Sequence, residues 1–453
     1  MSDHKMTPIE LHASWGLGIV FSLRMLGMFM VLPILTTYAI QLNDANETLI
    51  GVAIGVYGIS QAIFQIPIGF LSDRFGRKLL IIIGLCFFAI GSIIAALTQS
   101  IWGIILGRAL QGSGAISAAV MALLSDLTRE QNYTKAMTCI GISFGITFCI
   151  ATVLGPIITS KLGLQDLFWI IAILAIIAIL ITLLIVPSTS NHVLNRESEV
   201  IKSSVSYVIT DRYLIKLNLS VLFLHILLMS NFIAIPPKLI QIGLQPSDHW
   251  KIYLYTMIIS LVTAAPLIIY AEIKRKMKTI FISCVFLILG AEILLWTTDN
   301  NIWQALISLE IFFIGFNVME AILPSLISKQ SPAGYKGTAM GIYTTSQCIG
   351  VAIGGSMNGW ILESIGSHGV FLSNILISIF WLLIGYSLSE PLYLSSLRFT
   401  IKDSMTHAKQ IATYLKKKEG VFDILILPKE KSLYVKVDDK IITRKEIEKI
   451  LSK

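Results

Sequence analysis

The sequence predicts an all-α membrane protein with twelve transmembrane helices in two six-helix halves, followed by a small α+β domain at the C-terminus. Hydrophobic residues make up 55% of the chain and charged residues 14%, whereas soluble domains average about 25% charged residues. Twelve apolar runs are each long enough to cross a bilayer, which takes about 20 residues. A long polar connector at 187–213 divides these runs into six and six.

The runs define the elements that we expect, in chain order. Their expected bounds are 14–40, 49–71, 79–98, 101–125, 136–160, 166–186, 214–236, 250–271, 279–297, 302–327, 337–362 and 368–388. The first half therefore covers residues 1–186 and the second half residues 214–390. Ile101-Trp102 and Ile302-Trp303 open the fourth and tenth runs, an offset of 201 residues (302 minus 101). Such an internal repeat is typical of transporters built from two related halves.

The charges of the connectors predict the orientation of the chain. If the N-terminus is cytoplasmic, the inner connectors carry fifteen Lys and Arg residues and the outer connectors carry three. Cytoplasmic loops are the ones enriched in Lys and Arg, so we expect both termini in the cytoplasm. The formal net charge of +8 is concentrated in cytoplasmic segments and gives no reason to expect binding to nucleic acid.

Composition also excludes several functional classes. The five cysteines all fall inside apolar runs and form no Cys-x-x-Cys pair, so we expect no disulfide, no metal site and no cofactor. No Walker nucleotide-binding motif is present in the sequence, which argues against an ATP-driven pump. We therefore expect neither an ATP-driven pump nor an enzyme.

A short charged turn between the second and third runs is the most specific motif. It reads Gly69-Phe70-Leu71-Ser72-Asp73-Arg74-Phe75-Gly76-Arg77-Lys78. It resembles the signature cytoplasmic loop of the major facilitator superfamily, Gly-x-Leu-x-Asp-Arg-x-Gly-Arg-Lys, and implies the major facilitator fold. The resemblance implies a cytoplasmic gate motif made of Gly69, Asp73, Arg74, Gly76, Arg77, Lys78 and, at the end of the fourth run, Asp126. The alternative is a positively charged hairpin of some other membrane protein.

Two further stretches resemble motifs of the same superfamily. The stretch from Arg108 to Ala115 resembles the fourth-span motif Arg-x-x-Gln-Gly-x-Gly, whose arginine is associated with proton coupling in the family. Its glycines, Gly112 and Gly114, allow close helix packing, which is also the simpler explanation for them. Gly155 and Pro156 resemble the Gly-Pro motif of the antiporters' fifth span. That match is incomplete, because Ala151 stands where the family carries glycine, and this weakens the argument for export over import.

The last part of the chain is charged and has no long apolar run. We expect strands at 397–401, 421–427 and 433–437, with a helix around 408–415 and a second helix from about residue 443 onward. This βαββα order predicts a ferredoxin-like cytoplasmic domain at 397–453. The domain lacks the paired cysteines of soft-metal carriers, and its fourteen Lys and Arg against eight Asp and Glu favour contact with anionic lipid headgroups.

A major facilitator core with such a tail resembles the YajR-type drug:proton antiporters, over essentially the whole chain. The stretches 24–33 and 316–329 are similar to the first and tenth spans of that group. The resemblance implies a proton-coupled secondary transporter of the bacterial inner membrane that exports small amphipathic or drug-like solutes. A proton-coupled nutrient importer on the same fold and a transporter-derived sensor stay open as alternatives. We expect a monomer whose partners are protons, membrane lipids and an unknown small-molecule substrate.

Ionisable residues inside apolar runs are costly and mark candidate sites. Glu320 in the tenth run is a candidate for proton coupling, because burial favours the neutral form of a carboxyl group; a salt bridge to a cation is the alternative. His225 in the seventh run titrates near physiological pH and serves either coupling or packing. Arg24 in the first run either takes part in transport or ties helices together, and Arg108 is the coupling residue that the family motif implies.

The substrate cavity is expected between the two halves near the middle of the membrane. Its candidate lining residues are Met28, Met30, Gln61, Gln65, Asn231, Tyr343 and Gln347, with Glu310 as a further candidate. Glu310 also lies close to where Arg108 falls under the repeat offset, so we expect these two opposite charges to meet across the halves.

The charged turn gives the first prediction. The resemblance implies that Asp73 caps the eleventh span near Gly337 to Ala339 and so latches the two halves in the outward-open state. Asp73→Asn removes a charge whose interaction with a helix N-terminus is worth about 0.3–1 kcal/mol, and it should lower the outward-open population. Distances between spin labels on the two halves measure that population, and an unchanged distance distribution would contradict the latch.

Overall fold

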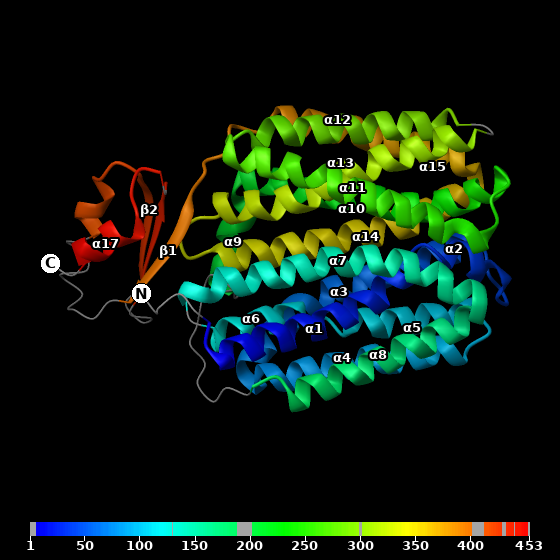
Figure 1. Ribbon diagram of the computed structural model, residues 1–453, viewed down its shortest axis with the longest axis horizontal. Helices are drawn as coiled ribbons and strands as arrows, with labels where there is room; N and C mark the ends of the chain where they lie inside the picture. The colour runs from blue at the N-terminus through cyan, green and yellow to red at the C-terminus, as the bar shows by residue number, and fades with distance from the viewer. Residues whose placement is uncertain are drawn as a thin grey trace.

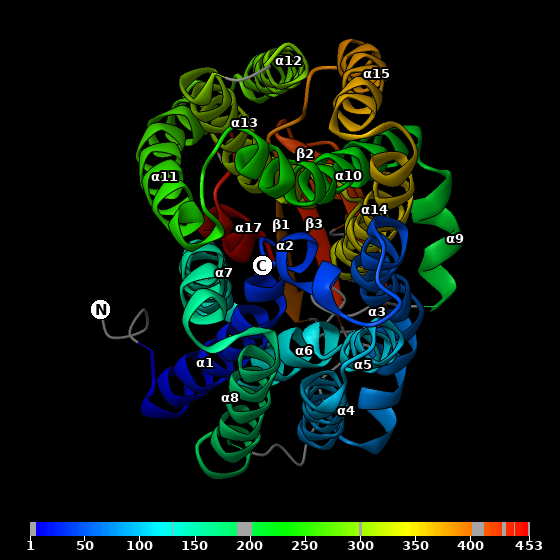
Figure 2. The same cartoon turned by 90° about the vertical axis from the view of Figure 1, so that its right-hand side faces the viewer.

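The computed structural model describes residues 6–128, 130–187, 202–298, 301–400, 412–427, 432–438 and 440–451. Long helices run roughly along the longest axis of the molecule, and a small domain with a β-sheet lies at one end (Figure 1). This end is called the domain end below, and the opposite end is called the far end. Viewed along the helices, α1 to α8 form one group and α10 to α15 form the other (Figure 2).

The first half follows the expected runs with two interruptions. Its elements are α1 (Pro8–Val31), α2 (Leu35–Tyr38), the 3-10 turn Ala39–Gln41, α3 (Glu47–Phe75), α4 (Arg77–Leu97), α5 (Ile101–Ser113), α6 (Ser117–Leu127), α7 (Glu130–Leu162) and α8 (Leu164–Leu184). The first run ends early because Pro33 has no backbone N–H with which to continue the helix. The fourth run divides into α5 and α6 at Gly114, where a Cβ atom would lie 2.3 Å from the carbonyl oxygen of Gly84.

The second half consists of long helices without such breaks. Its elements are α9 (Lys202–Thr210), α10 (Arg212–Gln241), the 3-10 turn Pro246–Asp248, α11 (His249–Ile273), α12 (Met277–Trp296), α13 (Ile302–Gln330), α14 (Lys336–Ile365) and α15 (Ser367–Tyr386). The helix α9 falls inside the expected polar connector at 187–213, so part of that connector is helical. Residues 188–201 of the connector lie outside the described part of the chain.

Eleven helical stretches in the described part of the chain are long and apolar enough to cross a membrane. The remaining expected span is α14, which stands at the position of the eleventh run but is less apolar. It packs between α3 of the first half and α10 of the second. A helix enclosed in this way needs little lipid-facing surface, which accounts for its many glycine and polar positions.

The helices α3 and α14 join the two halves through glycines. A Cβ atom at Gly51 would lie 2.5 Å from the carbonyl oxygen of Gly355, a separation that leaves no room for a side chain. Nearer the far end, the backbone N–H of Thr48 donates to Glu363 Oε2 over 3.0 Å. The two halves are therefore closed against each other at the far end.

The C-terminal domain has the strand order of a ferredoxin-like fold. Its elements are β1 (Ser395–Thr400), β2 (Val421–Leu427), β3 (Ser432–Val437) and α17 (Arg444–Leu451). The central strand β3 pairs antiparallel with both β1 and β2. One face of the sheet packs with the helices in an apolar core that includes Phe399, Leu415 and Ile447. Of the helix expected around 408–415, the structure describes residues 412–416, which are helical.

The other face of this sheet is held against the second half. Lys436 of β3 donates from Nζ to the carbonyl oxygens of Ser328 and Lys329, near the end of α13, over 3.0 and 2.7 Å. Arg275, in the turn between α11 and α12, donates two hydrogen bonds of 2.8 and 2.6 Å to Asp438. These contacts attach the C-terminal domain to one half of the molecule.

The glycine contact predicts that Gly51→Ala will open the far end, because the new methyl group overlaps the backbone of α14. Overpacking of this kind typically costs about 1–3 kcal/mol, which shifts the population away from the arrangement closed at the far end. Distances between spin labels at the far ends of α3 and α14 measure the shift. Gly141→Ala is the matched control, since a Cβ atom at Gly141 has nothing within 4 Å. Identical distance distributions in the two variants would show that the glycine contact is unimportant.

The docking contacts predict that Arg275→Ala will loosen the C-terminal domain. A partly exposed bidentate pair contributes about 1 kcal/mol, so protease cleavage between α15 and β1 should become several-fold faster. Lys274→Ala is the control, because Lys274 is the exposed neighbour of Arg275. Wild-type cleavage rates in Arg275→Ala would mean that the pair does not hold the domain.

The same pair sets the pH dependence of docking. The hydrogen bonds from Arg275 lower the pKa of the Asp438 carboxyl. A lowered carboxyl pKa gives stability that is fully present above the unfolded value, about 3.9, and is lost as the pH falls through the lowered pKa. The cleavage rate of the wild-type protein should therefore stay constant between about pH 8 and pH 5. A rise in cleavage within this interval would show that other groups control docking.

Candidate functional site

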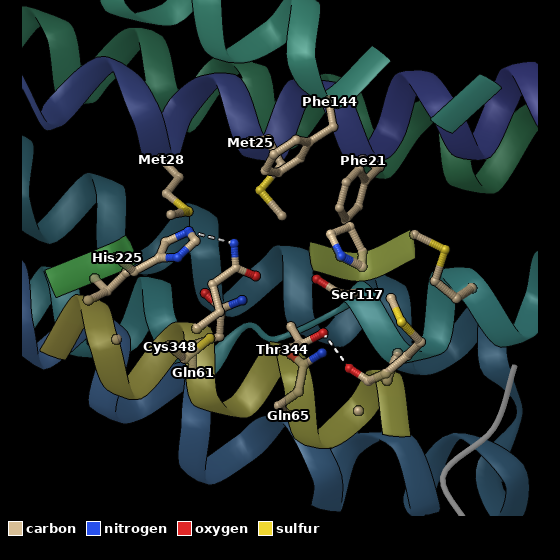
Figure 3. Close-up of a pocket in the computed structure, with 18 of the residues that line it drawn as sticks. Phe21, Met25, Met28, Gln61, Gln65, Ser117, Phe144, His225, Thr344 and Cys348 are labelled. Carbon is tan, nitrogen blue, oxygen red and sulfur yellow. Dashed lines mark hydrogen bonds between the residues drawn. The ribbon is translucent and has the colours of Figure 1, made fainter. Parts of the chain in front are cut away.

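A cavity of about 620 Å³ lies between the two halves. Residues of α1, α3, α6 and α7 line it from the first half, and residues of α10, α13 and α14 line it from the second. It extends from the level of His225 toward the domain end, where Ser328 and Gly337 border it. Figure 3 shows side chains from both halves pointing into this space, among them Met25 and Phe144.

Methionine and phenylalanine side chains are prominent in the cavity lining. Six methionines and three phenylalanines border it, namely Met25, Met28, Met121, Met137, Met229, Met340, Phe21, Phe29 and Phe144. Methionine is unbranched and adapts to irregular shapes, and aromatic rings offer flat faces for stacking. The polar lining includes Gln61, Gln65 and Gln347. A pocket of this size and character suits small, largely apolar molecules that carry a few polar groups.

Three expected residues meet beside the cavity. The amide nitrogen of Gln347 on α14 lies 2.7 Å from Nε2 of His225 on α10 and 3.3 Å from Oε1 of Glu320 on α13. His225 Nδ1 lies 3.0 Å from the carbonyl oxygen of Val221. In the neutral ring Nδ1 therefore carries the hydrogen, and Nε2 accepts a hydrogen bond from Gln347. One amide group thus bridges the imidazole and the carboxyl group.

The carboxyl group of this cluster has no permanent cation beside it. The ion-pair partner of Glu320 in the described part of the chain is His225, at 3.8 Å between Nε2 and Oε2, and this ring is charged only when protonated. The salt bridge to Lys or Arg, which was the alternative for Glu320, is therefore absent from the described residues. Glu320 Oε2 is buried and accepts no hydrogen bond. Gain or loss of one proton consequently changes the net charge of the cluster.

The two candidate arginines lie in the first half and share one tyrosine. Arg24 donates from Nη2 to the Tyr57 hydroxyl over 3.1 Å, and the Arg108 guanidinium lies 4.4 Å from the centroid of the Tyr57 ring. Arg108 also donates to Gln111 Oε1 over 2.9 Å. The expected contact between Arg108 and Glu310 is wrong, because Arg108 turns to these partners within its own half. Tyr57 lines the cavity, so both cations lie directly behind the cavity wall.

The charged turn connects α3 to α4 at the domain end. Gly76 has a φ of 98°, a backbone conformation that favours glycine. Arg77 Nε lies 3.0 Å from Asp126 Oδ2, and both side chains are buried. Lys78 donates from Nζ to two carbonyl oxygens at the end of α8, over 3.1 and 2.7 Å. The side chain of Asp73 lies outside the described part of the structure, so its place in this cluster stays a prediction.

The glycines of the other motifs bring helices into backbone contact. A Cβ atom at Gly112 would lie 2.4 Å from the carbonyl oxygen of Tyr57, and one at Gly155 would lie 2.3 Å from that of Met30. Pro156 follows inside the helix α7. These positions therefore have a packing role, whatever further role they have in transport.

Four candidate lining residues lie away from the cavity: Met30, Asn231, Glu310 and Tyr343 are not among its lining residues. The backbone of Met30 packs against Gly155. The side chain of Asn231 points into the second half, where its amide donates a hydrogen bond to Glu292. The depth of each residue in the membrane was predictable, but the side of the helix on which it lies was not. A membrane helix enclosed by other helices has no strongly polar face to mark the cavity side.

One polar network was missed at the sequence level. Glu292 on α12 is fully buried and accepts hydrogen bonds from the amides of Asn231 and Asn374. The signal was present, because Glu292 is an isolated acidic residue within the apolar run 279–297. Among the described residues, no group of three or more His, Cys, Asp or Glu side chains is arranged to hold a metal ion.

Long apolar helices in two halves around a central cavity are the architecture of a membrane transport protein. The profile of the Major Facilitator Superfamily matches residues 17–355, and the profile of the YajR YAM domain matches residues 397–453. The chain belongs to the major facilitator superfamily.

Individual relatives agree with this assignment. The chain is 58% identical over 451 residues to the inner membrane transport protein YajR of Escherichia coli (strain K12), with 100% of this chain and 99% of that protein covered. It is 27% identical over 194 residues to the class B tetracycline resistance protein of Escherichia coli, covering 42% and 48% of the two chains. A bacterial homologue of the human lysosomal transporter Spinster, solved in an inward-facing and occupied conformation, superposes with a TM-score of 0.68 at 12% identity, covering 85% of this chain and 98% of that one. At that identity the likeness concerns the fold alone.

Proposed function

We propose that this protein is a proton-coupled secondary transporter that exports small amphipathic or drug-like solutes by alternating access. The observation that carries the proposal is the cluster of Glu320, Gln347 and His225 beside a mostly apolar cavity. The partial similarity to a protein named for tetracycline resistance supports export as the direction.

Glu320 is the proton-binding residue of this mechanism. A carboxyl group removed from water favours its neutral form, and no permanent cation in the described part of the chain opposes that preference. When Glu320 ionises, the Gln347 amide and a protonated His225 are the groups that stabilise its charge. Protons thereby enter and leave a site that borders the substrate cavity.

Gln347 couples the proton to the substrate. It lines the cavity and donates toward both Glu320 and His225. A substrate that takes a hydrogen bond from this amide removes it from the carboxylate, and this favours the protonated form of Glu320. A substrate that carries positive charge instead favours the ionised form and competes with the proton. The Gln347 amide makes the first link and the charge of Glu320 makes the second. The second, in which substrate and proton exclude each other, gives the exchange that proton-driven export requires.

We assign the domain end to the cytoplasm. The charged turn with Arg77 and Lys78 lies at this end, and cationic loops are characteristic of the cytoplasmic side. The cavity extends toward this end while the α3–α14 contact closes the far end, so the arrangement corresponds to an inward-open state. The buried pair of Arg77 and Asp126 then belongs to the gate that closes the cytoplasmic side in the opposite state.

The proposal predicts that Glu320→Gln will lose coupling and keep binding. The amide imitates a permanently protonated carboxyl group, so proton-driven flux should fall to background while the affinity for the solute changes only a few-fold. The measurement uses inside-out vesicles with an imposed pH gradient and a panel of amphipathic dyes that includes ethidium. His225→Gln is the companion variant and should shift the pH dependence of flux, because it removes the second titratable group of the cluster.

Glu310→Gln is the matched control for this experiment. Glu310 lies on the same helix as Glu320, but the described hydrogen bonds and ion pairs that join Glu320 to Gln347 and His225 do not include it, so the flux of Glu310→Gln should match that of the wild type. Full pH-dependent flux in Glu320→Gln would remove Glu320 from the mechanism. Accumulation of the panel dyes in the reverse direction only would favour import over export.

A further inference from the structure

A second buried carboxyl group joins three helices of the second half. Oε1 of Glu292 on α12 accepts a hydrogen bond of 2.7 Å from the amide of Asn231 on α10. Its Oε2 accepts one of 2.9 Å from the amide of Asn374 on α15. The oxygen of Asn374 in turn accepts a hydrogen bond of 2.7 Å from the Ser230 hydroxyl. The chain of bonds therefore runs from Ser230 through Asn374 and Glu292 to Asn231, away from the cavity.

No cation balances Glu292 within the described part of the chain. Titratable groups on the helices around α12 include His225 and Lys238 of α10, His249 and Tyr253 of α11, Glu310 and Glu320 of α13, and His368 of α15. The described hydrogen bonds to the carboxyl group come from Asn231 and Asn374. Burying an ionised carboxylate without a cation is far more costly than burying a neutral acid. Burial therefore favours a proton on Glu292.

The hydrogen-bond network can also accommodate a proton on Glu292. Both oxygens of Glu292 act as acceptors, and Asn231 Oδ1 is fully buried without a partner. An asparagine amide occupies nearly the same space when it is turned over, with its oxygen and nitrogen exchanged. If Asn374 turns over, a protonated Glu292 donates to the amide oxygen and the amide nitrogen donates to Ser230. The protonated network then keeps its three contacts, with the direction of donation reversed in the two bonds that involve Asn374.

We propose that Glu292 is a second proton-binding residue of this protein, and that its proton joins α10 to α12 and α15. Asn231 follows His225 by six residues on α10, so the bound proton also positions the helix that carries His225. The effect on the helix that carries His225 rests on the proposed transport function, whereas the presence of the proton on Glu292 does not.

Infrared spectroscopy of the purified full-length protein tests the bound proton directly. A protonated carboxyl group has a C=O stretching band that is separate from the bands of ionised carboxylates. We expect this region of the wild-type spectrum at neutral pH to lose one component in Glu292→Gln. It should stay unchanged in Glu363→Gln, whose carboxyl group is exposed. A Glu292→Gln spectrum identical to that of the wild type would show that Glu292 is ionised and would overturn the proposal.

Thermal unfolding as a function of pH gives a second, independent test. The unfolded chain releases the Glu292 proton above the ordinary carboxyl pKa of about 4.3, whereas the folded protein retains it, so the wild-type midpoint should fall as the pH rises from about 5 to 7 and the midpoint of Glu292→Gln should fall less. Glu292→Ala leaves two buried amides unpaired and should unfold at a lower temperature than Glu292→Gln at every pH. An equal fall of the midpoint between about pH 5 and 7 in wild type and Glu292→Gln, or equal midpoints for Glu292→Gln and Glu292→Ala, would contradict the bound proton.

The effect of the Glu292 proton on the position of α10 is tested by measuring dye flux as a function of pH. Glu292→Gln should extend proton-driven flux to higher pH, whereas Glu320→Gln should lose it at all pH values. If flux falls at the same high pH in Glu292→Gln as in the wild type, the proton on Glu292 does not position α10. Absence of flux from the wild type would refute the proposed function, and the infrared result would still decide whether Glu292 holds a proton.

Discussion

The backbone contact between α3 and α14 is the interaction on which the rest of the structure depends. The contact joins the halves at the far end, and it exists because Gly51 and Gly355 carry no side chains. The same helix α14 carries Gln347, which bonds His225 and Glu320 nearer the middle of the molecule. Separation of the halves at the far end must therefore move or turn the helix that holds the proposed proton site together. The glycines thus affect both the access of the substrate and the surroundings of the carboxyl group.

The ionisable candidates inside the apolar runs are divided between the halves by sign. The first half encloses the cations Arg24 and Arg108, and the second half carries the carboxyl groups of Glu292 and Glu320. The described hydrogen bonds and ring contacts of Arg24 and Arg108 lie within their own half, at Tyr57 and its neighbours. Bonds confined to one half survive when the halves move, whereas a salt bridge across the interface would have to break in each cycle. The missing Arg108–Glu310 contact is consistent with this arrangement.

The sequence was sufficient to predict most of the fold, because span length and charge are properties of short segments. The signature turn, the strand order of the tail and the helix at each expected run were all accessible in this way. The break at Gly114 was not, because it depends on the approach of a second helix at Gly84. Within the site, Glu320, His225 and Gln347 were singled out separately, but their meeting depends on three helices from distant parts of the chain. The rotation of each helix about its axis also decided that Asn231 faces Glu292 and not the cavity.

The attachment of the C-terminal domain to the second half has a practical consequence for imaging. A transporter of 50.0 kDa whose two halves are alike has little outside the membrane by which the orientation of single particles can be determined. Here Arg275 and Lys436 fix a folded domain to one half, and this domain projects beyond the helices at one end (Figure 1). It breaks the approximate two-fold symmetry and provides a fiducial mark. Electron microscopy images aligned on that mark would hold the second half still and display the movement of the first half directly.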